Sequence, residues 1–432
     1  MQQGWLTKTF KGDRAIWGLV ALFMIYSLLA VYSSSVGVAF MKYGGNTTYF
    51  LKSQLFMLAL GLTIIVIVHY LPYRIYFSMA GLILLISIGL LGLTLAIGSR
   101  VNEAMRAITI PGTGFRLQTS DVAKVALVLY LARSLAKYQK ELNNFMLVTK
   151  YFIFPVGIVC GLIMPENLST ALMIFGMSMI IMFIGRVPFK FLLAYAGIGV
   201  VAVLLFAMVL MVVKKDNRVQ VWKNRIEQFF SGKVNEDRDY QSNQAKVAIS
   251  TGGLFGKAPG KSTQRNILPQ SNSDFIFAII IEEYGLLFGA IPLILAYMIL
   301  LFRGITIAKK CETAFPAFLV LGLIVMIVIQ AMINMLVAVG LFPVTGQTLP
   351  MVSWGRTSVL VMSFSLGAIL SVSRVVNARI KKEELPEEEI TDEGEKIYEP
   401  AKTSTSDNQW WRYRRTYLSG YIDCECSQEN RT

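Results

Sequence analysis

The sequence predicts an all-α polytopic membrane protein with about ten transmembrane helices and one long extracytoplasmic loop. Hydrophobic residues make up 54% of the chain and the mean hydropathy is +0.55, while only 16% of residues are charged. Soluble domains carry about 25% charged residues. The apolar residues also gather into runs whose lengths are close to the ~20 residues that a bilayer requires. The predicted spans are residues 15–35, 52–70, 76–97, 120–139, 149–164, 168–185, 190–213, 275–302, 315–340 and 357–374.

The distribution of charge divides the chain into three predicted parts. Residues 1–14 form a cytoplasmic segment, residues 15–374 form the membrane domain, and residues 375–432 form a cytoplasmic tail. Lys and Arg flank alternate short loops, and cytoplasmic loops carry the excess of these residues. Both termini are therefore expected in the cytoplasm, and the 214–274 loop outside. The charged start of the tail predicts disorder.

The composition excludes several classes of site. His69 is the single histidine, which argues against a Ser-His-Asp triad or a histidine-based metal site. Four cysteines in a chain of this length do not make a disulfide framework, and Cys424 and Cys426 lack zinc-site spacing. The net charge of +14 does not predict nucleic-acid binding, because many cations flank the spans. The first apolar run has no signal-peptide cleavage site and is long enough to span.

Asp274 lies where the long polar loop meets the eighth predicted span. A carboxylate at the edge of the hydrocarbon is costly unless it has partners or a task. The first hypothesis is a catalytic base at the membrane surface. The alternative is a helix N-cap, since Ser273 and Asp274 are both good capping residues. If the helix includes Asp274, this residue and Glu282 share one face.

Two further pairs of polar residues lie inside predicted spans. Asp121 and Lys124 are three residues apart, which suits mutual neutralisation or support of a site. Gln330 and Asn334 are four residues apart, and such amides more often join helices by hydrogen bonds than bind substrate. The outer loops are unusually rich in cations. These cations suit the binding of an anion such as a lipid pyrophosphate. The alternative is that they have no such role, because long loops are translocated regardless of their charge.

Four stretches, in order along residues 15–380, resemble motifs of the SEDS (shape, elongation, division, sporulation) family. The strongest runs from Leu268-Pro269 through Asp274-Phe275-Ile276-Phe277-Ala278 to Glu282-Glu283-Tyr284-Gly285, and is similar to L-P-E-x-x-T-D-F-I-F-A…E-E-x-G. The T-L-P form near the end of the chain favours the FtsW branch over the RodA branch. The other motif-like stretches are Asn102 to Arg106 with Gln118 to Lys124, Tyr240-Gln241 to Ser262, and Pro343 to Gly355, which resembles P-V-T-G-x-T-L-P-F-I-S-Y-G.

The chain departs from the family pattern at several positions. Arg356 replaces a second glycine, and a bulky cation in a tight glycine turn is expected to strain the loop. Asn167 stands near a usual Asp and cannot act as an acid or base. Asp121 replaces Glu, which preserves the chemistry.

The resemblance implies a peptidoglycan glycosyltransferase that polymerises lipid II on the outer face of the bacterial cytoplasmic membrane. It works beside a class B penicillin-binding protein and other membrane proteins of the division or elongation complex. Asp274 matches the family's essential Asp, and a divalent cation (Mg or Mn) is possible. The alternatives are a RodA-like elongation polymerase, a lipid II flippase or transporter, and an inactive division scaffold. The expected pyrophosphate-binding residues are Arg106, Lys124, Arg218 and Lys261, and the expected supporting residues are Asp121, Gln118, Gln241, Glu283 and Ser353.

Overall fold

A computed structural model describes most of the chain outside its two ends. The described residues are 11–42, 46–97, 99–101, 104–109, 116–212, 240–268 and 271–383, with two short strands at 389–390 and 396–397. The fold divides into two units, Met1–Asn377 and Ala378–Thr432. The described helices all begin in the first unit. In the second, the described strands β4 (Glu389–Ile390) and β5 (Lys396–Ile397) pair antiparallel. Residues 375–383 of the predicted cytoplasmic tail form the last turns of α16, and the rest of the tail otherwise lies outside the described residues.

The described residues contain eight helices that are long and apolar enough to cross a membrane. The chain is therefore a multi-pass α-helical membrane protein, as its composition predicts. One of the eight crossings combines α13 and α14 into a single apolar stretch, Ile276–Lys309. The eight crossings are α2 (Arg14–Ser34), α4 (Thr47–Tyr70), α5 (Tyr73–Ile97), α7 and α8 (Phe145–Val148 and Phe154–Ile163), α10 (Phe189–Val212), α13 and α14 (Ile276–Gly285 and Ile291–Lys309), α15 (Ala314–Ala338) and α16 (Arg356–Glu383).

The other two predicted spans are also helices, α6 (Thr119–Lys137) and α9 (Leu168–Ile184). With 17 residues, α9 is slightly short for a membrane span. In contrast, α6 carries charged residues but packs against α5, α8, α9 and α15, so most of its side chains are buried by protein. Each of the ten predicted apolar runs therefore forms a helix.

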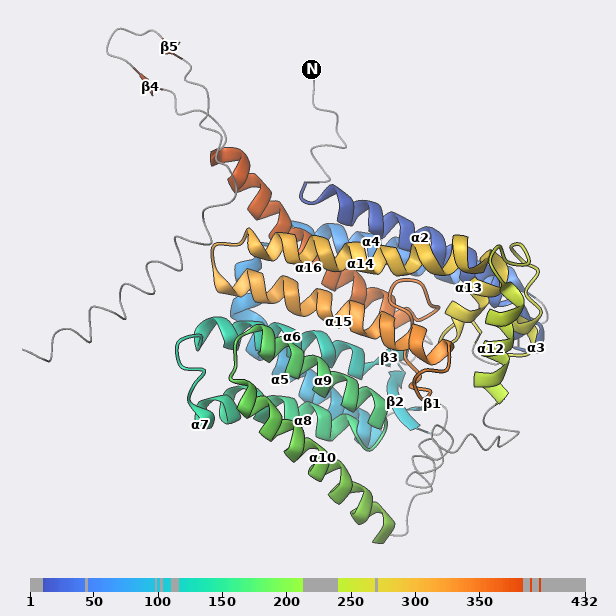
Figure 1. The fold of residues 1–432 in the computed structure, drawn as a ribbon, viewed down its shortest axis with the longest axis horizontal. Helices are drawn as coiled ribbons and strands as arrows, with labels where there is room; N and C mark the ends of the chain where they lie inside the picture. The colour runs from blue at the N-terminus through green and yellow to red at the C-terminus, as the bar shows by residue number, and fades with distance from the viewer. Residues whose placement is uncertain are drawn as a thin grey trace, which may run out of the picture. The chain divides into compact units, whose positions relative to one another are not determined.

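The helices differ in how much protein surrounds them. Within the membrane windows, 67% of residues are buried in both α15 and α16, against 11% in α10. Figure 1 shows α15 inside the bundle, while α10 crosses obliquely at its edge. Residues on α15 are therefore placed to contact several other helices, and this helix carries Gln330 and Asn334.

Two π-helical segments interrupt the apolar helices. Thr149–Ile153 joins α7 to α8, and Leu286–Ala290 joins α13 to α14. A proline follows each segment, at Pro155 and Pro292. Because proline lacks the N–H that an α-helix needs, the wider π-turn is a natural accommodation. The Phe288 carbonyl in the second segment accepts a hydrogen bond from Tyr26 Oη at 2.8 Å.

Short elements gather at one end of the bundle, which is called the sheet end below (Figure 1). The sheet is antiparallel in the order β1-β2-β3. It occupies part of the predicted 98–119 loop and was not predicted from the sequence. The elements at this end are α3 (Val36–Lys42), β1 (Ser99–Val101), β2 (Ala104–Thr109), β3 (Arg116–Gln118) and α12 (Tyr240–Gly252), and a 3-10 turn at Gln264–Asn266 lies in the loop after α12.

Candidate active site

Asp274 lies in a turn at residues 271–275, immediately before α13. The N-cap residue of α13 is Phe275, and no side chain caps this helix. The predicted capping role of Ser273 or Asp274 is therefore wrong. The prediction that Asp274 and Glu282 share a helix face is also wrong, because the helix begins only at Ile276. Asp274 is half-buried.

Four consecutive residues of this turn each make at least one hydrogen bond to another part of the fold, and four of these bonds fix the chain. Two of the partners lie in the connection between α15 and α16, one lies at the end of α2, and one lies on α15 itself. Three of the four bonds use a backbone carbonyl of the turn as acceptor. The backbone that carries Asp274 is therefore held on three sides. The bonds are Ser271 Oγ to Ser34 O (2.9 Å), Trp354 N to Asn272 O (2.8 Å), Ser353 Oγ to Ser273 O (2.7 Å) and Asn334 Nδ2 to Asp274 O (2.9 Å).

Asn334 links the turn to a buried polar network. Its Nδ2 atom also donates to the backbone carbonyl of Gln347, at 2.7 Å. The Gln347 side chain in turn accepts from Lys124 Nζ at 3.2 Å and donates to Thr170 Oγ1 at 2.6 Å. Helices α6, α9 and α15 thus meet the α15–α16 connection at a single glutamine. The sequence offered no clear signal for this role of Gln347, which is one polar residue in a motif-like stretch.

Lys124 is the charged centre of this network and has no solvent exposure. Its Nζ atom pairs with Asp121 at 2.8 Å and donates to Gln330 Oε1 at 2.8 Å and to Gln347. An ammonium group has three donors, so these three acceptors use all of them. The buried charge is balanced by Asp121, as buried cations require. In this arrangement Lys124 has no donor left for a pyrophosphate, and its contacts suit a supporting role.

A second polar cluster surrounds Glu282, which is fully buried on α13. Its carboxylate accepts from Lys257 Nζ (2.7 Å), from the Thr263 amide (3.1 Å) and from Thr263 Oγ1 (2.9 Å). It also accepts from Ser262 Oγ and from the Gln264 amide. All these donors belong to the loop after α12. Glu282 therefore fastens this loop to α13.

Glu283, the neighbouring residue, anchors the same loop to α2. Its carboxylate accepts a hydrogen bond from Ser33 Oγ and one from the Ser262 amide, and Arg265 Nη1 lies 3.8 Å away. The same Arg265 atom donates to Ser33 Oγ at 3.0 Å. Glu283 was predicted as a supporting residue, and these contacts make it an anchor. Residues 252–268 together with Glu282 and Glu283 are called the glutamate clamp below.

Glycines allow the clamp to lie directly on the helix backbone. A Cβ atom on Gly252 would lie 2.2 Å from Ile281 O, and one on Gly256 would lie 2.3 Å from Glu283 O. Gly285 has a φ of +73°, and a Cβ there would meet Leu254 O at 2.4 Å. No side chain fits at such distances. The glycine-rich stretch therefore packs directly against the backbone of the helix that carries Glu282 and Glu283.

The remaining predicted site residues lie around the sheet end. Gln118 ends β3; its backbone N–H donates to Thr357 Oγ1 at 3.2 Å, and its side chain donates to Ser120 Oγ at 3.3 Å. Gln241 is half-buried on α12, and Lys261 is exposed within the clamp. Arg106 belongs to β2. Arg218 lies outside the described residues.

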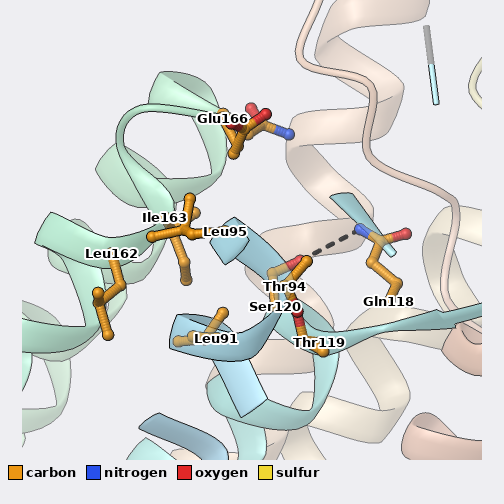
Figure 2. Close-up of a pocket in the computed structure, with 10 residues that line it drawn as sticks. Leu91, Thr94, Leu95, Gln118, Thr119, Ser120, Leu162, Ile163 and Glu166 are labelled. Carbon is orange, nitrogen blue, oxygen red and sulfur yellow. Dashed lines mark hydrogen bonds between the residues drawn. The ribbon is translucent and has the colours of Figure 1, made fainter. Parts of the chain in front are cut away.

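A pocket lies between α5, α6 and the turn that joins α8 to α9 (Figure 2). Leu91, Leu95 and Leu162 supply apolar surface, while Gln118 and Glu166 supply polar groups. Figure 2 shows the hydrogen bond from Gln118 to Ser120 at this pocket. The pocket is thus lined by one predicted supporting residue. Within the described part of the chain, no three His, Cys, Asp or Glu side chains are grouped to hold a metal ion.

Comparison with known proteins identifies the family. The family model described as "Cell cycle protein" (FTSW_RODA_SPOVE) matches residues 13–378. This chain belongs to the FtsW/RodA/SpoVE family. The "Probable peptidoglycan glycosyltransferase FtsW" of Trichlorobacter lovleyi is 32% identical over 373 residues, which cover 83% of this chain and 93% of that protein. "Stage V sporulation protein E" of Bacillus subtilis is 30% identical over 376 residues, covering 85% and 98%.

A solved structure confirms the fold of this FtsW/RodA/SpoVE family member. It is described as "Structural coordination of polymerization and crosslinking by a peptidoglycan synthase complex" and matches with a TM-score of 0.66 at 24% identity. The match covers 86% of this chain and 99% of that chain. The predicted resemblance to the SEDS family, which comprises these proteins, is confirmed.

The departures from the family pattern have simple structural explanations. Arg356 is the first residue of α16, and its φ is not positive. The predicted strain at Arg356 is therefore wrong, because the position is helical and no glycine conformation is needed. Asn167 is the N-cap of α9, where Oδ1 accepts from the Thr170 amide at 3.1 Å. An Asn performs this capping role as well as an Asp.

Proposed function

We propose that this protein is a peptidoglycan glycosyltransferase that polymerises lipid II, with Asp274 as the general base. The observation that carries the proposal is the turn at residues 271–275, whose chain is fixed around Asp274 by four bonds to α2, α15 and the α15–α16 connection. Three of the four motif-like stretches are connected at this turn. Ser353 and Trp354 bond to it directly, and Lys124 is linked to it through Gln347 and Asn334. Relatives at about 30% identity are named as probable peptidoglycan glycosyltransferases.

The chemistry requires a base at a fixed position. A hydroxyl of one lipid-linked glycan attacks the anomeric carbon of another, a new glycosidic C–O bond forms, and the bond to pyrophosphate breaks. Undecaprenyl pyrophosphate leaves, and the hydroxyl proton passes to the Asp274 carboxylate. A positioned general base contributes about 10²–10⁴-fold to such a rate. The rigid backbone around Asp274 serves this purpose because the base must stay within hydrogen-bond reach of the hydroxyl.

Cations are expected to stabilise the charge that develops on the leaving pyrophosphate. Arg106, Arg218 and Lys261 remain the proposed contacts, with a divalent cation as a possible addition. Lys124 takes another role in this proposal: it supports the network behind Asp274 and does not touch substrate. The proposed partner is a class B penicillin-binding protein, because the matched structure is described as a complex for polymerization and crosslinking.

The proposed setting is septal wall synthesis. It rests on the T-L-P form at Thr348-Leu349-Pro350 and on the FtsW names among the relatives. An elongation or sporulation role is the alternative, since SpoVE of Bacillus subtilis is similar to nearly the same degree. Depletion of the protein in its own cells distinguishes them: loss of division yields filaments, whereas loss of elongation yields rounded cells.

The first test is polymerisation of labelled lipid II by the purified protein with its penicillin-binding partner. Wild type is expected to form glycan strands, and Asp274→Asn to lose at least about a hundredfold in rate. Glu312→Gln is the matched control, because Glu312 is an exposed acid in the connection between α14 and α15. Equal rates for wild type and Asp274→Asn would remove Asp274 from the mechanism. An inactive wild-type complex would favour the flippase or scaffold alternatives.

The proposed orientation puts the sheet end outside the cell and both termini inside. Single cysteines introduced at Ser242 and Ser406, in a background without Cys424 and Cys426, test it. Ser242→Cys is expected to react with an impermeant maleimide on intact spheroplasts, and Ser406→Cys only after lysis. Native Cys311 gives little background at pH 8, because burial raises the pKa of its thiol to about 12. Labelling of both positions from one side would refute this orientation.

A further inference from the structure

Arg356 contacts two aromatic residues at the sheet end. Its Nη2 atom donates to Tyr49 Oη at 3.3 Å, and its Cζ atom lies 5.9 Å from the centre of the Trp354 ring. A guanidinium at this distance over an indole ring makes a cation–π contact. Tyr49 belongs to the first turn of α4, whereas Trp354 precedes α16. Arg356 therefore joins the start of α4 to the residues that lead into α16.

Trp354 connects this contact to the turn that carries Asp274. The backbone N–H of Trp354 donates to Asn272 O at 2.8 Å, and Asn272 lies two residues before Asp274. The Trp354 ring also lies 5.3 Å from the ring of Phe50 on α4. The indole thus contacts both an aromatic ring and a guanidinium. Movement of the Trp354 backbone would therefore displace Asn272 through the hydrogen bond between them.

A similar contact between α16 and α4 is made by Arg374, further along α16. Arg374 donates from Nη2 to the Tyr70 carbonyl at 3.1 Å, and its Cζ atom lies 5.4 Å from the Tyr70 ring centre. Tyr70 is the last residue of α4. Two Arg–Tyr contacts therefore tie α4 to α16, one at each end of α4. They are separated by 18 residues of helix, or about 27 Å. Among the described contacts, the one at Arg356 is linked to the Asp274 turn, through Trp354 and its hydrogen bond to Asn272.

We propose that Arg356 is a positioning residue, which fixes Trp354 between α4 and α16 and thereby holds Asn272 and the Asp274 turn in place. The catalytic part of this inference rests on the function proposed above. Among the described side chains, Arg356 alone places a guanidinium over the Trp354 ring and also donates a hydrogen bond to α4. A lysine keeps the charge, but it lacks the planar group that stacks and bonds at once.

Hydrogen exchange tests the inference without reference to activity. The measured quantity is the exchange rate of the Trp354 amide, the donor to Asn272, in the full-length protein. Arg356→Ala is expected to speed this exchange about tenfold, with Arg356→Lys intermediate. Arg374→Ala removes the matched contact at the other end of α4 and is expected to leave the exchange rate of the Trp354 amide unchanged. Unchanged exchange in Arg356→Ala, or equal acceleration in Arg374→Ala, would overturn the proposal.

Polymerisation kinetics then separate positioning from substrate binding. Arg356→Ala is expected to lower kcat about fivefold and to leave KM for lipid II within twofold of wild type. Tyr49→Phe should have a smaller effect on kcat and add little to Arg356→Ala, because both remove the same link. If Arg356→Ala instead raises KM for lipid II and Arg356→Lys has the KM of wild type, then Arg356 binds the anionic part of the substrate. That result would overturn the positioning role. An inactive wild type would defeat the proposed function, while the exchange result would still decide whether Arg356 holds the turn.

Discussion

The Asp274 turn and the glutamate clamp both place carboxylates at the sheet end, yet the hydrogen bonds described above fix different parts of Asp274 and Glu282. In the clamp, the oxygens of Glu282 are occupied by Lys257, hydroxyls and backbone amides, and its side chain is fully buried. In the turn, the bonds that fix the chain go largely to backbone carbonyls, and the Asp274 residue is half-buried. The contacts of the Glu282 carboxylate fasten a loop, whereas the fixed backbone at Asp274 suits the proposed general base.

This difference also separates the two regions in their expected response to mutation. Changes in the clamp and in the buried ion pair should lower stability, because they leave buried polar groups without partners. Changes in the residues that fix the turn should lower turnover with little loss of folded protein.

Replacement of Lys124 by Met is expected to destabilise the protein by about 3–5 kcal/mol, because Asp121 then stays buried without its cation. Thermal unfolding in detergent measures the effect. The double variant Asp121→Leu with Lys124→Met removes both charges and should cost less than Lys124→Met alone. If the double variant is the less stable of the two, the ion pair is not the main contribution of these residues.

Gly256→Ala should destabilise the clamp by roughly 2–4 kcal/mol, from backbone conformation and overpacking together. The residue has a φ of +79°, and a new Cβ would lie 2.3 Å from Glu283 O. Gly253 is the matched control: its φ is +56°, but a Cβ added there would have no other atom within 4 Å. Gly253→Ala should therefore cost only about 1–2 kcal/mol. If Gly256→Ala and Gly253→Ala lose the same thermal stability, the contact between the new Cβ at position 256 and Glu283 O adds no cost.

Glu282→Gln is expected to lower stability by about 2–3 kcal/mol, because an amide puts a donor among the donors that now surround the carboxylate. Glu312→Gln is the control, since exposed substitutions usually stay within about 0.5 kcal/mol. If Glu282 only fastens the loop, the folded Glu282→Gln protein keeps most of its turnover. A large loss of turnover at unchanged stability would instead show that Glu282 takes part in the reaction.

Much of this molecule could be predicted from its sequence, because the signals are local. Hydropathy located the ten predicted helices, including α6, whose charges are covered by neighbouring helices. The position of Asp274 at the edge of an apolar run marked the candidate base. The N-cap prediction failed because the turn at residues 271–275 delays the helix to Ile276, and bonds from distant residues stabilise that turn.

The roles of Gln347 and Asn334 depend on contacts between segments far apart in the sequence. Gln347 meets Lys124 across 223 positions and Thr170 across 177. No local pattern specifies such a meeting. Gln330 was expected to join helices and does so through Lys124 on α6. Asn334, in contrast, bonds to the Asp274 turn and to Gln347, which are not helical. The small sheet at β1–β3 was missed for a similar reason: its strands are 3 to 6 residues long, too short for an alternating pattern.

Asn334→Leu is expected to lower turnover clearly, with a loss of stability of about 1–3 kcal/mol from the carbonyls that lose their donor. The change removes the donor shared by Asp274 O and Gln347 O, so the turn loses its bond to α15. A tenfold lower kcat, which corresponds to about 1.4 kcal/mol, is expected with little change in KM. Polymerisation rates per folded molecule give the measurement.

The matched control is Asn144→Ala, which removes the side-chain cap of α7. That change should cost about 1 kcal/mol of stability and leave kcat unchanged. Figure 1 shows α7 at the end of the bundle opposite the sheet end. If Asn334→Leu lowers stability and spares kcat, as Asn144→Ala should, the fixed backbone does not control the base. The turn would then differ from the clamp in its contacts and not in its function.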